Sequence, residues 1–275
     1  MSGVLEDILA KKREEIAALA SGPSPTPRAV KPGLVDALSR GPSTSRGALR
    51  LIAEIKQRSP SAGELSRALS PADRALAYAR AGAAMISVLT DGPFFGGSFA
   101  DLRACRDALD VELGDSRPYL LCKEFVLDPA QLDHAASAGA DAALLIVRCL
   151  DGDPAALPAL VRAAEDRGLV PLVEVTNEDE LGRALAAGAR VIGVNARDLD
   201  TLRMDPARAA RVLALIDPHL VAVHLSGLRA PEDVRAVAGG RADAALIGEA
   251  LMREDDPRPL LAAMVEASRD RRAES

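Results

Sequence analysis

A regular alternation of short apolar runs and helical patterns limits most strongly what this chain can fold into. From residue 51 onward, eight apolar runs of strand length occur, at residues 51–55, 85–89, 119–122, 142–147, 169–175, 191–194, 220–225 and 244–248. Each run is followed by a stretch with helical spacing, near residues 71–82, 98–110, 129–138, 155–167, 177–187, 206–216, 231–238 and 257–270. Strands that alternate with helices form parallel sheets, and eight such units close a barrel. The sequence therefore predicts an α/β fold, a (β/α)8 TIM barrel.

A weak internal repeat supports one array of strand-helix units. Similar segments, each with a small-residue turn between a helix and a strand, begin at residues 81, 138, 187 and 240. Gly82, Gly139 and Gly188 fit the left-handed position that commonly follows a helix. A doubly wound open sheet is the alternative fold. Against it, no G-x-G-x-x-G motif follows the first strand.

The first 47 residues carry a different pattern. Residues 4–20 have apolar side chains at near-helical spacing with charged residues between them, which predicts an amphipathic helix. A Pro-rich connector follows at 21–33, then a short helical pattern at 34–40 and a Gly/Ser/Pro loop at 41–47. We expect a single barrel domain over residues 1–275, with a helical extension at 1–47 and the barrel at 48–275.

Composition and charge exclude several function classes. The net charge is −6, hydrophobic residues make up 48% and aromatic residues 2% of the chain, so neither a nucleic-acid surface nor a membrane patch is expected. The sequence has no signal-peptide pattern and no apolar run near the ~18 residues that span a bilayer. The three cysteines and three histidines follow no metal-ligand spacing. We expect a cytoplasmic protein with no metal and no cofactor.

The first strand-like run ends in two charged residues. Glu54 and Lys56 are two positions apart, so in a strand both side chains point to the same face. Charges on the inward face of a barrel strand, at its carboxyl end, are typical of catalytic residues. The alternative is a solvated edge strand that ends in an ordinary turn.

Polar residues also end most of the other strands. In a barrel they would converge on one opening, and they are Ser87, Lys123, Glu124, Glu174, Asn195, Arg197 and Ser226. Each could have a structural role by itself, such as a helix cap or a turn. Their common position at the ends of successive strands favours an active site.

The last two strands are followed by glycine-containing turns. Ser226-Gly227 and Gly248-Glu249 predict a phosphate site, because such barrels bind phosphate with backbone N–H groups after strands seven and eight. Lys56 or Arg197 could add positive charge to this site. The alternative is a pair of ordinary strand-to-helix turns.

Several motifs, in order along nearly the whole chain, resemble the indole-3-glycerol phosphate synthase family of tryptophan biosynthesis. They include the N-terminal Ile-Leu-Ala-Lys-Lys-Arg-Glu-Glu-Ile segment and the stretches at 53–61, 87–98, 122–125, 172–175, 192–199, 226–228 and 248–253. The resemblance implies a carboxy-lyase. Its reaction closes the ring of 1-(2-carboxyphenylamino)-1-deoxyribulose 5-phosphate, with loss of CO2 and water, and needs no cofactor or metal.

The resemblance also implies roles for individual residues. Lys123 would be the general acid that activates the ketone, and Glu174 would serve acid/base work in the dehydration. Glu54 and Lys56 would complete the charged cluster, Asn195 would position the substrate, and Arg197 would support the network. The remaining substrate-binding residues implied are Ser226, Gly227, Gly248 and Glu249 near the phosphate, and Ser59, Pro60, Phe95, Phe125 and Leu199 elsewhere in the pocket.

Three motifs depart from the family pattern. Leu225-Ser226-Gly227 stands where the family usually has Glu-Ser-Gly, so one active-site carboxylate is missing. Glu124 replaces an Asp after Lys123, and Ala196 stands between Asn195 and Arg197. Because the principal acid and base remain, we predict an active enzyme. The alternatives are a divergent enzyme acting on a modified anthranilate-derived substrate or another phosphosugar through a Lys123 Schiff base, and a non-catalytic binding paralogue.

The expected partners follow from the same reading. The ligand is a phosphorylated small molecule, with neither nucleic acid nor membrane as a partner. Other tryptophan-pathway enzymes are candidate partners, and the chain is expected to be a monomer or a weak homo-oligomer.

Overall fold

Eight parallel strands close into a barrel in the computed structural model, which describes residues 4–20, 26–41, 46–59, 63–198 and 200–269. In the order in which they hydrogen-bond around the barrel, the strands are β1 (Arg50–Ile55), β10 (Ala244–Ile247), β9 (Val221–Leu225), β8 (Val191–Asn195), β7 (Val170–Val175), β6 (Ala142–Ile146), β5 (Tyr119–Lys123) and β4 (Met85–Leu89). The predicted (β/α)8 barrel is therefore confirmed, and the open sheet is wrong.

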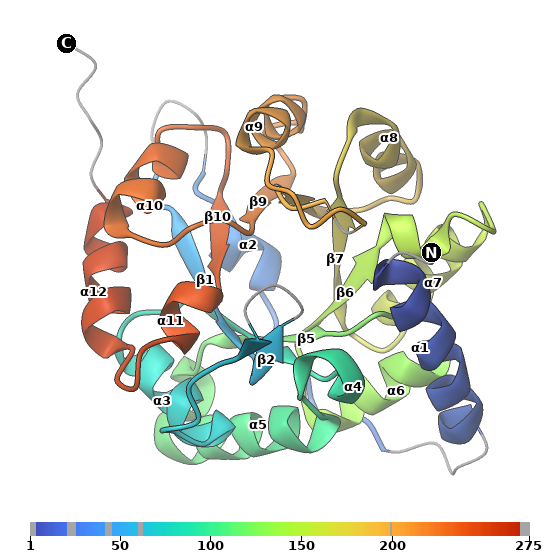
Figure 1. Ribbon diagram of the computed structural model, residues 1–275, viewed down its shortest axis with the longest axis horizontal. Coiled ribbons are helices and arrows are strands. Elements are labelled where there is room, and N and C mark those ends of the chain that lie inside the picture. Colours follow the sequence, from blue (N-terminus) through green and yellow to red (C-terminus); the bar gives the residue numbers. More distant parts are fainter. Residues whose placement is uncertain (1–3, 21–25, 42–45, 60–62, 199, 270–275) are drawn as a thin grey trace.

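A helix follows each of these strands and packs outside the barrel (Figure 1). The helices are α3 (Pro71–Arg80), α5 (Phe99–Leu113), α6 (Pro129–Ala138), α7 (Ala156–Glu165), α8 (Glu178–Ala186), α9 (Pro206–Ala214), α10 (Pro231–Ala238) and α12 (Arg258–Ala267). The glycines of the repeat end helices as predicted: Gly82, Gly139 and Gly188 have φ of 95°, 93° and 83°. The small-residue turns thus return the chain from helix to strand.

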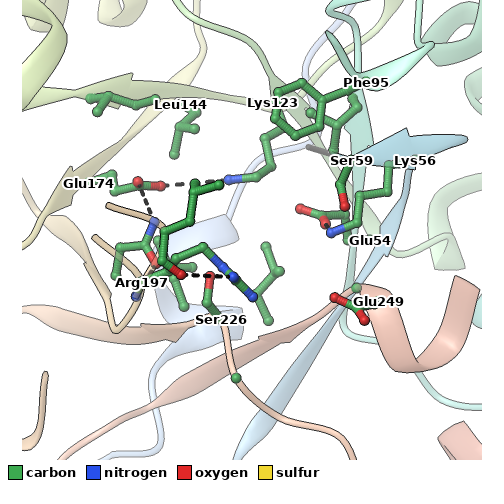
Figure 2. Close-up of a pocket in the computed structure, with 18 of the residues that line it drawn as sticks. Glu54, Lys56, Ser59, Phe95, Lys123, Leu144, Glu174, Arg197, Ser226 and Glu249 are labelled. Carbon is green, nitrogen blue, oxygen red and sulfur yellow. Dashed lines mark hydrogen bonds and ion pairs between the residues drawn. The ribbon is translucent and has the colours of Figure 1, made fainter. Parts of the chain in front are cut away.

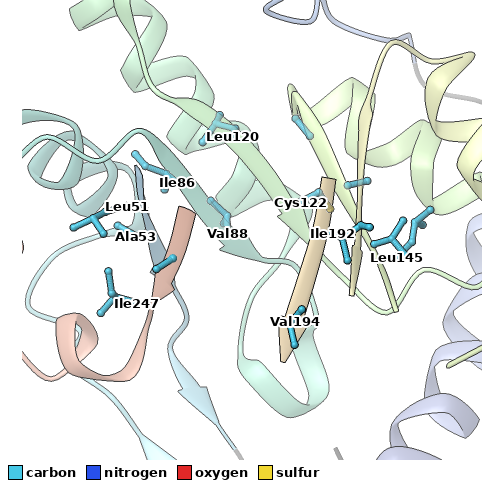
Figure 3. Packing of buried hydrophobic residues seen from close by; sticks show 14 of the residues in the cluster. Leu51, Ala53, Ile86, Val88, Leu120, Cys122, Leu145, Ile192, Val194 and Ile247 are labelled. Atoms are coloured by element: carbon cyan, nitrogen blue, oxygen red, sulfur yellow. The ribbon is translucent and has the colours of Figure 1, made fainter. Parts of the chain in front are cut away.

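Side-chain alternation along the strands divides the core into two layers. Outward residues such as Leu51, Ile86 and Leu145 pack against the helices (Figure 3). Inward residues such as Ile52, Leu121 and Leu172 fill the barrel. The inward-facing residues become polar only near the carboxyl ends of several strands. The rest of the barrel interior is filled by apolar side chains.

The N-terminal segment contributes to both ends of the barrel. Helix α2 (Leu34–Leu38) packs buried Leu34 and Leu38 into the cluster of inward-facing residues, near the start of β5. There the Tyr119 hydroxyl donates to the Pro32 carbonyl at 2.8 Å. Helix α1 (Val4–Ala20) packs Leu5 and Ile8 into the same cluster at the opposite end, beside Phe125.

Several short elements were not predicted. A two-stranded antiparallel pair, β2 (Arg58–Ser59) and β3 (Gly63–Glu64), follows β1. Helices α4 (Gly92–Phe95) and α11 (Glu249–Met252) precede α5 and α12, and 3-10 turns lie at Gly114–Ser116 and Val147–Leu150. Such elements are too short to show periodicity, so sequence patterns do not reveal them. In the described part of the chain, no helix is both long and apolar enough to cross a bilayer.

A buried ion pair joins the N-terminal segment to the amino-terminal end of the barrel. Arg117 donates to both Asp141 carboxylate oxygens at 2.6 and 2.9 Å, and the exposed fractions of the two side chains are 3% and 0%. Asp141 also accepts from the backbone N–H groups of Lys31 and Leu120. The carboxylate therefore holds three segments together.

We predict that Asp141→Asn lowers the free energy of unfolding by about 3 kcal/mol, because buried Arg117 loses the carboxylate that it contacts with two nitrogens and keeps, among the described residues, only Asp110, 3.0 Å away and 33% exposed. Asp107→Asn is the matched control, since Asp107 pairs with Arg28 at the surface with 55% of its side chain exposed. The control should change stability by less than about 1 kcal/mol. Chemical denaturation measures both, and equal effects would contradict the prediction.

Candidate active site

A pocket opens at the carboxyl ends of the strands, where the polar inward-facing residues gather. It is lined by thirteen of the fifteen residues proposed from the sequence, namely Glu54, Lys56, Ser59, Phe95, Lys123, Phe125, Glu174, Asn195, Arg197, Ser226, Gly227, Gly248 and Glu249. The other two, Pro60 and Leu199, lie outside the described residues. The structure thus brings together, from seven strands and their following loops, side chains that are up to 195 positions apart in the sequence (54 to 249).

Lys123 and Glu174 face each other across this opening (Figure 2). Their Nζ and Oε2 atoms are 3.6 Å apart, and 19% and 2% of the two side chains are exposed. The other oxygen of Glu174 accepts a hydrogen bond from the Asn195 amide at 2.8 Å. Asn195 in turn accepts from the backbone N–H of Arg197 at 2.9 Å. Asn195 therefore fixes the orientation of the carboxylate that faces Lys123.

A second ion pair lies across the pocket. Lys56 Nζ donates to Glu54 Oε1 at 2.6 Å, and only 3% of the Glu54 side chain is exposed. Burial alone would raise the pKa of Glu54, but the ammonium groups of Lys56 and Lys123 lower it below its ordinary value. Glu54 is thus held as a carboxylate between two lysines.

Three buried side-chain polar atoms on the barrel strands themselves accept or donate no hydrogen bond within the described chain. They are Glu54 Oε2, Glu174 Oε2 and Ser87 Oγ. Buried polar atoms are nearly always satisfied in folded proteins, and exceptions concentrate where a substrate completes the set. In Glu174, one oxygen is fixed by Asn195 while the other faces the Lys123 ammonium group without a hydrogen bond.

The two glycine-containing turns lie on one side of the pocket. Ser226 and Gly227 both have positive φ, 70° and 95°, which is uncommon for serine and marks a constrained turn after β9. The ring of His224 bonds the Ser226 carbonyl at 3.0 Å, and burial lowers the pKa of this histidine. Gly248 precedes α11 and lies against Glu54 and Lys56. This side offers backbone N–H groups near two cations, Lys56 and Arg197.

The opposite side of the pocket is apolar and aromatic. Phe95 and Phe125 have ring centroids 6.0 Å apart, and both line the pocket. Leu144 and Ile146 from β6 extend this wall. A planar aromatic group fits here, while a phosphate fits the polar side.

Comparisons with known proteins identify the family. The family model described as indole-3-glycerol phosphate synthase matches residues 5–264. The chain belongs to the indole-3-glycerol phosphate synthase family. Relatives of that name are similar over nearly full length: one from Parafrankia sp. (strain EAN1pec) is 42% identical, covering 97% of this chain and 94% of its own. Another, from Mycobacterium ulcerans, is 41% identical, covering 97% and 92%.

Solved structures share the fold at lower identity. A 3-hexulose-6-phosphate synthase from Salmonella typhimurium aligns with a TM-score of 0.63 at 15% identity, covering 80% of this chain and 98% of its own. A thiamine phosphate pyrophosphorylase from Pyrococcus furiosus aligns with a TM-score of 0.57 at 16% identity, covering 80% and 95%. At this level of identity, these similarities show a shared barrel fold.

Leu225, the departure from the family pattern, lies on the inward face of β9 and lines the pocket. It is 2% exposed and lies opposite Asn195 in the strand register. A methyl group built on Gly193 would meet Leu225 Cδ1 at 2.7 Å and Leu172 Cδ2 at 2.8 Å. Leu225 therefore packs tightly over Gly193, which makes this part of the pocket wall apolar.

Sequence reasoning missed the residues that the N-terminal helix brings to the pocket. Val4, Leu5 and Ile8 of α1 line it, although the helix was expected only as an extension. Leu202, Leu228, Arg229 and Leu246 line it as well. The apolar stripe of α1 indicates that it packs on something, but helical spacing alone does not say on which surface.

Metal ligands do not cluster in the described part of the chain: no group of three or more His, Cys, Asp or Glu side chains there is placed to hold an ion. The expectation that no metal and no cofactor take part stays a prediction.

Gly248 gives a direct test of how closely the site is packed. A methyl group at this position would overlap Glu54 Oε1 and lie 3.0 Å from Lys56 Nζ. We predict that Gly248→Ala lowers kcat/KM for the family's substrate by about 100-fold, because it displaces this ion pair. Gly182→Ala on α8, where the added methyl meets open space, should leave steady-state kinetics unchanged. Wild-type kinetics in Gly248→Ala would contradict the prediction.

Proposed function

We propose that this chain catalyses the reaction of its family, the conversion of 1-(2-carboxyphenylamino)-1-deoxyribulose 5-phosphate to indole-3-glycerol phosphate, CO2 and water. The observation that carries the proposal is the Lys123–Glu174 pair, which lies between an aromatic wall and a turn-lined polar wall. The substrate has an aromatic ring at one end, a phosphate at the other and a ketone between them. It matches the pocket in that order.

Lys123 is the proposed general acid for ring closure. As the ring carbon attacks the ketone carbon, a new carbon-carbon bond forms and the carbonyl oxygen gains negative charge. An ammonium group beside that oxygen stabilises the charge and can transfer its proton. Departure of CO2 then restores the aromatic ring.

Glu174 is the proposed acid/base group for the dehydration. Its Oε2 accepts no hydrogen bond from the described residues, so this oxygen is available to take a proton, while Asn195 holds Oε1. Glu54 and Lys56 would complete the charged cluster, and Arg197 would support it. Asn195 acts on the substrate through Glu174 in this arrangement.

The two walls would hold the substrate ends. Ser226, Gly227, Gly248 and Glu249 would bind the phosphate through backbone N–H groups. Ser59, Phe95 and Phe125, together with Pro60 and Leu199, would enclose the aromatic ring. Fixing both ends places the reacting atoms between Lys123 and Glu174.

We further propose that the chain works as a monomer or a weak homo-oligomer. The strongly exposed large apolar side chains of the described chain are Val111, Leu185 and Leu215. They lie on α5, on α8 and just after α9, and three such side chains expose too little apolar surface for a large interface patch.

We predict that Lys123→Ala lowers kcat by about 100- to 10,000-fold, the range of a lost general acid. Stability should also fall, because the buried Glu174 carboxylate loses the ammonium group that lies 3.6 Å from it. The measurement is formation of indole-3-glycerol phosphate, followed by absorbance, with the melting temperature as control for folding. Wild-type turnover in Lys123→Ala would rule out its role. Borohydride trapping of substrate on Lys123 would instead favour a Schiff-base enzyme.

Leu225→Glu tests whether the missing carboxylate matters. We predict that kcat/KM is preserved or raised, because the rest of the site matches the family, while stability falls by roughly 1–3 kcal/mol from lost packing and a buried charge. Leu225→Ala is the control for the loss of packing alone. A large loss of turnover in Leu225→Glu but not in Leu225→Ala would mean that the pocket has been rebuilt around Leu225, and would favour a modified anthranilate-derived substrate.

A further inference from the structure

Lys12 is a buried cation on the packed face of α1. The buried residues of this helix are spaced as Leu5, Ile8 and Lys12, so the lysine continues the stripe that covers the pocket. Only 3% of its side chain is exposed. Lys12 itself does not line the pocket.

The Lys12 ammonium lies among three carboxylates from three elements. Its Nζ is 2.6 Å from Glu15 Oε2 on α1, 3.0 Å from Asp91 Oδ2 before α4, and 2.9 Å from Glu124 Oε1 after β5. Burial is the largest influence on this lysine and opposes its charge, yet the carboxylates together raise its pKa above the ordinary value. Lys12 is therefore a charged group that ties α1 to two loops of the barrel.

The contact between Lys12 and Asp91 connects Lys12 to the short helix that carries Phe95, part of the aromatic wall. Asp91 Oδ1 caps α4 by accepting from the backbone N–H groups of Phe94 and Phe95, at 2.8 and 3.2 Å. Its Oδ2 accepts no well-formed hydrogen bond within the described chain and faces Lys12. The position of Asp91, and with it that of Phe95, thus depends on the Lys12 charge.

The contact between Lys12 and Glu124 connects Lys12 to the chain segment that carries Lys123. Glu124 follows Lys123 directly and accepts from the backbone N–H of Phe125 at 2.8 Å and from the Thr90 hydroxyl at 2.9 Å. It is 3% exposed, and burial raises its pKa while Lys12 opposes that rise. Removing Lys12 would leave the Glu124 carboxylate buried without the ammonium group that lies 2.9 Å from its Oε1 atom.

We propose that Lys12 is a positioning residue for the reaction: it fixes α1 over the pocket and, through Asp91 and Glu124, sets the places of Phe95, Phe125 and Lys123. The kinetic part of this proposal rests on the proposed function, whereas the anchoring of α1 does not. Misplacement of groups by about 1 Å can lower turnover about 100-fold, so a residue outside the pocket can have a large effect.

The decisive variant is Lys12→Met, with Lys11→Met as the matched control. Lys11 neighbours Lys12 on the same helix and also pairs with a glutamate three residues on, at 2.8 Å, but its side chain is 50% exposed. We expect Lys12→Met to lower kcat/KM about 100-fold and to raise KM about 10-fold, because the aromatic wall loses its fixed position. Lys11→Met should stay within about 2-fold of wild type in both constants.

A second variant separates positioning from stability. A protein that is only partly folded has fewer active sites, which lowers apparent kcat and leaves KM unchanged. In Lys12→Met/Glu124→Gln the buried uncompensated charge of Glu124 is gone, and Gln can still accept from the Phe125 N–H. Asp91, which is also buried, still lacks its cation in this double variant, so we expect the variant to regain part of the melting temperature lost in Lys12→Met while KM stays raised. Recovery of both KM and melting temperature would overturn the proposal in favour of a purely structural lysine.

Hydrogen exchange of residues 4–20 gives a readout that needs no activity. In Lys12→Met, amides of α1 should exchange at least about 10-fold faster than in wild type and Lys11→Met, because local opening is easier. Unchanged exchange would show that Lys12 does not anchor α1. If wild type itself forms no indole-3-glycerol phosphate, the proposed function fails, while this measurement still decides the anchoring.

Discussion

Closure of the barrel is the constraint on which the site depends. When eight parallel strands close, the last inward-facing residue of every strand points toward one opening, whatever its distance along the sequence. Glu54, Lys123, Glu174 and Asn195 occupy this position on their strands. The inward-facing residues nearer the start of the strands are apolar. They pack beneath the charged residues and exclude water from that side.

Charges held in such a layer must balance one another, because burial disfavours each of them alone. The pocket carries two acid-lysine pairs, Glu54 with Lys56 and Glu174 with Lys123. Behind the wall, Lys12 lies among three further carboxylates. The two pairs line the pocket, whereas the Lys12 cluster connects α1 to two loops of the barrel. The proposed catalytic and positioning roles thus rely on the same kind of interaction at different depths.

Leu225 shows how one position alters this balance. An acid there would have placed another negative charge beside Asn195 and Ser226. Leucine instead packs against Gly193 and Leu172 and makes the wall apolar. The pairs of Lys56 and Lys123 remain complete without it, which agrees with a site that keeps its acid and its base.

The sequence by itself determined the barrel and the positions of its main strands and helices, because alternation and turn glycines are local signals. Polar strand ends predicted the polar residues that closure brings together, whereas Ser59, Phe95 and Phe125 were expected only from the family resemblance. Only the tertiary structure decided the rest. It decided three contacts between separate strands: Asn195 holds Glu174, Gly248 lies against Glu54, and Leu225 covers Gly193.

The position of α1 is the clearest case. Its amphipathic stripe shows that the helix packs, but the sequence places Lys12 only among the charged residues between the apolar ones. Two of its three partners lie 79 and 112 residues away (91 − 12 and 124 − 12). No local pattern specifies partners at such distances, since they meet only when the folded barrel brings their loops together.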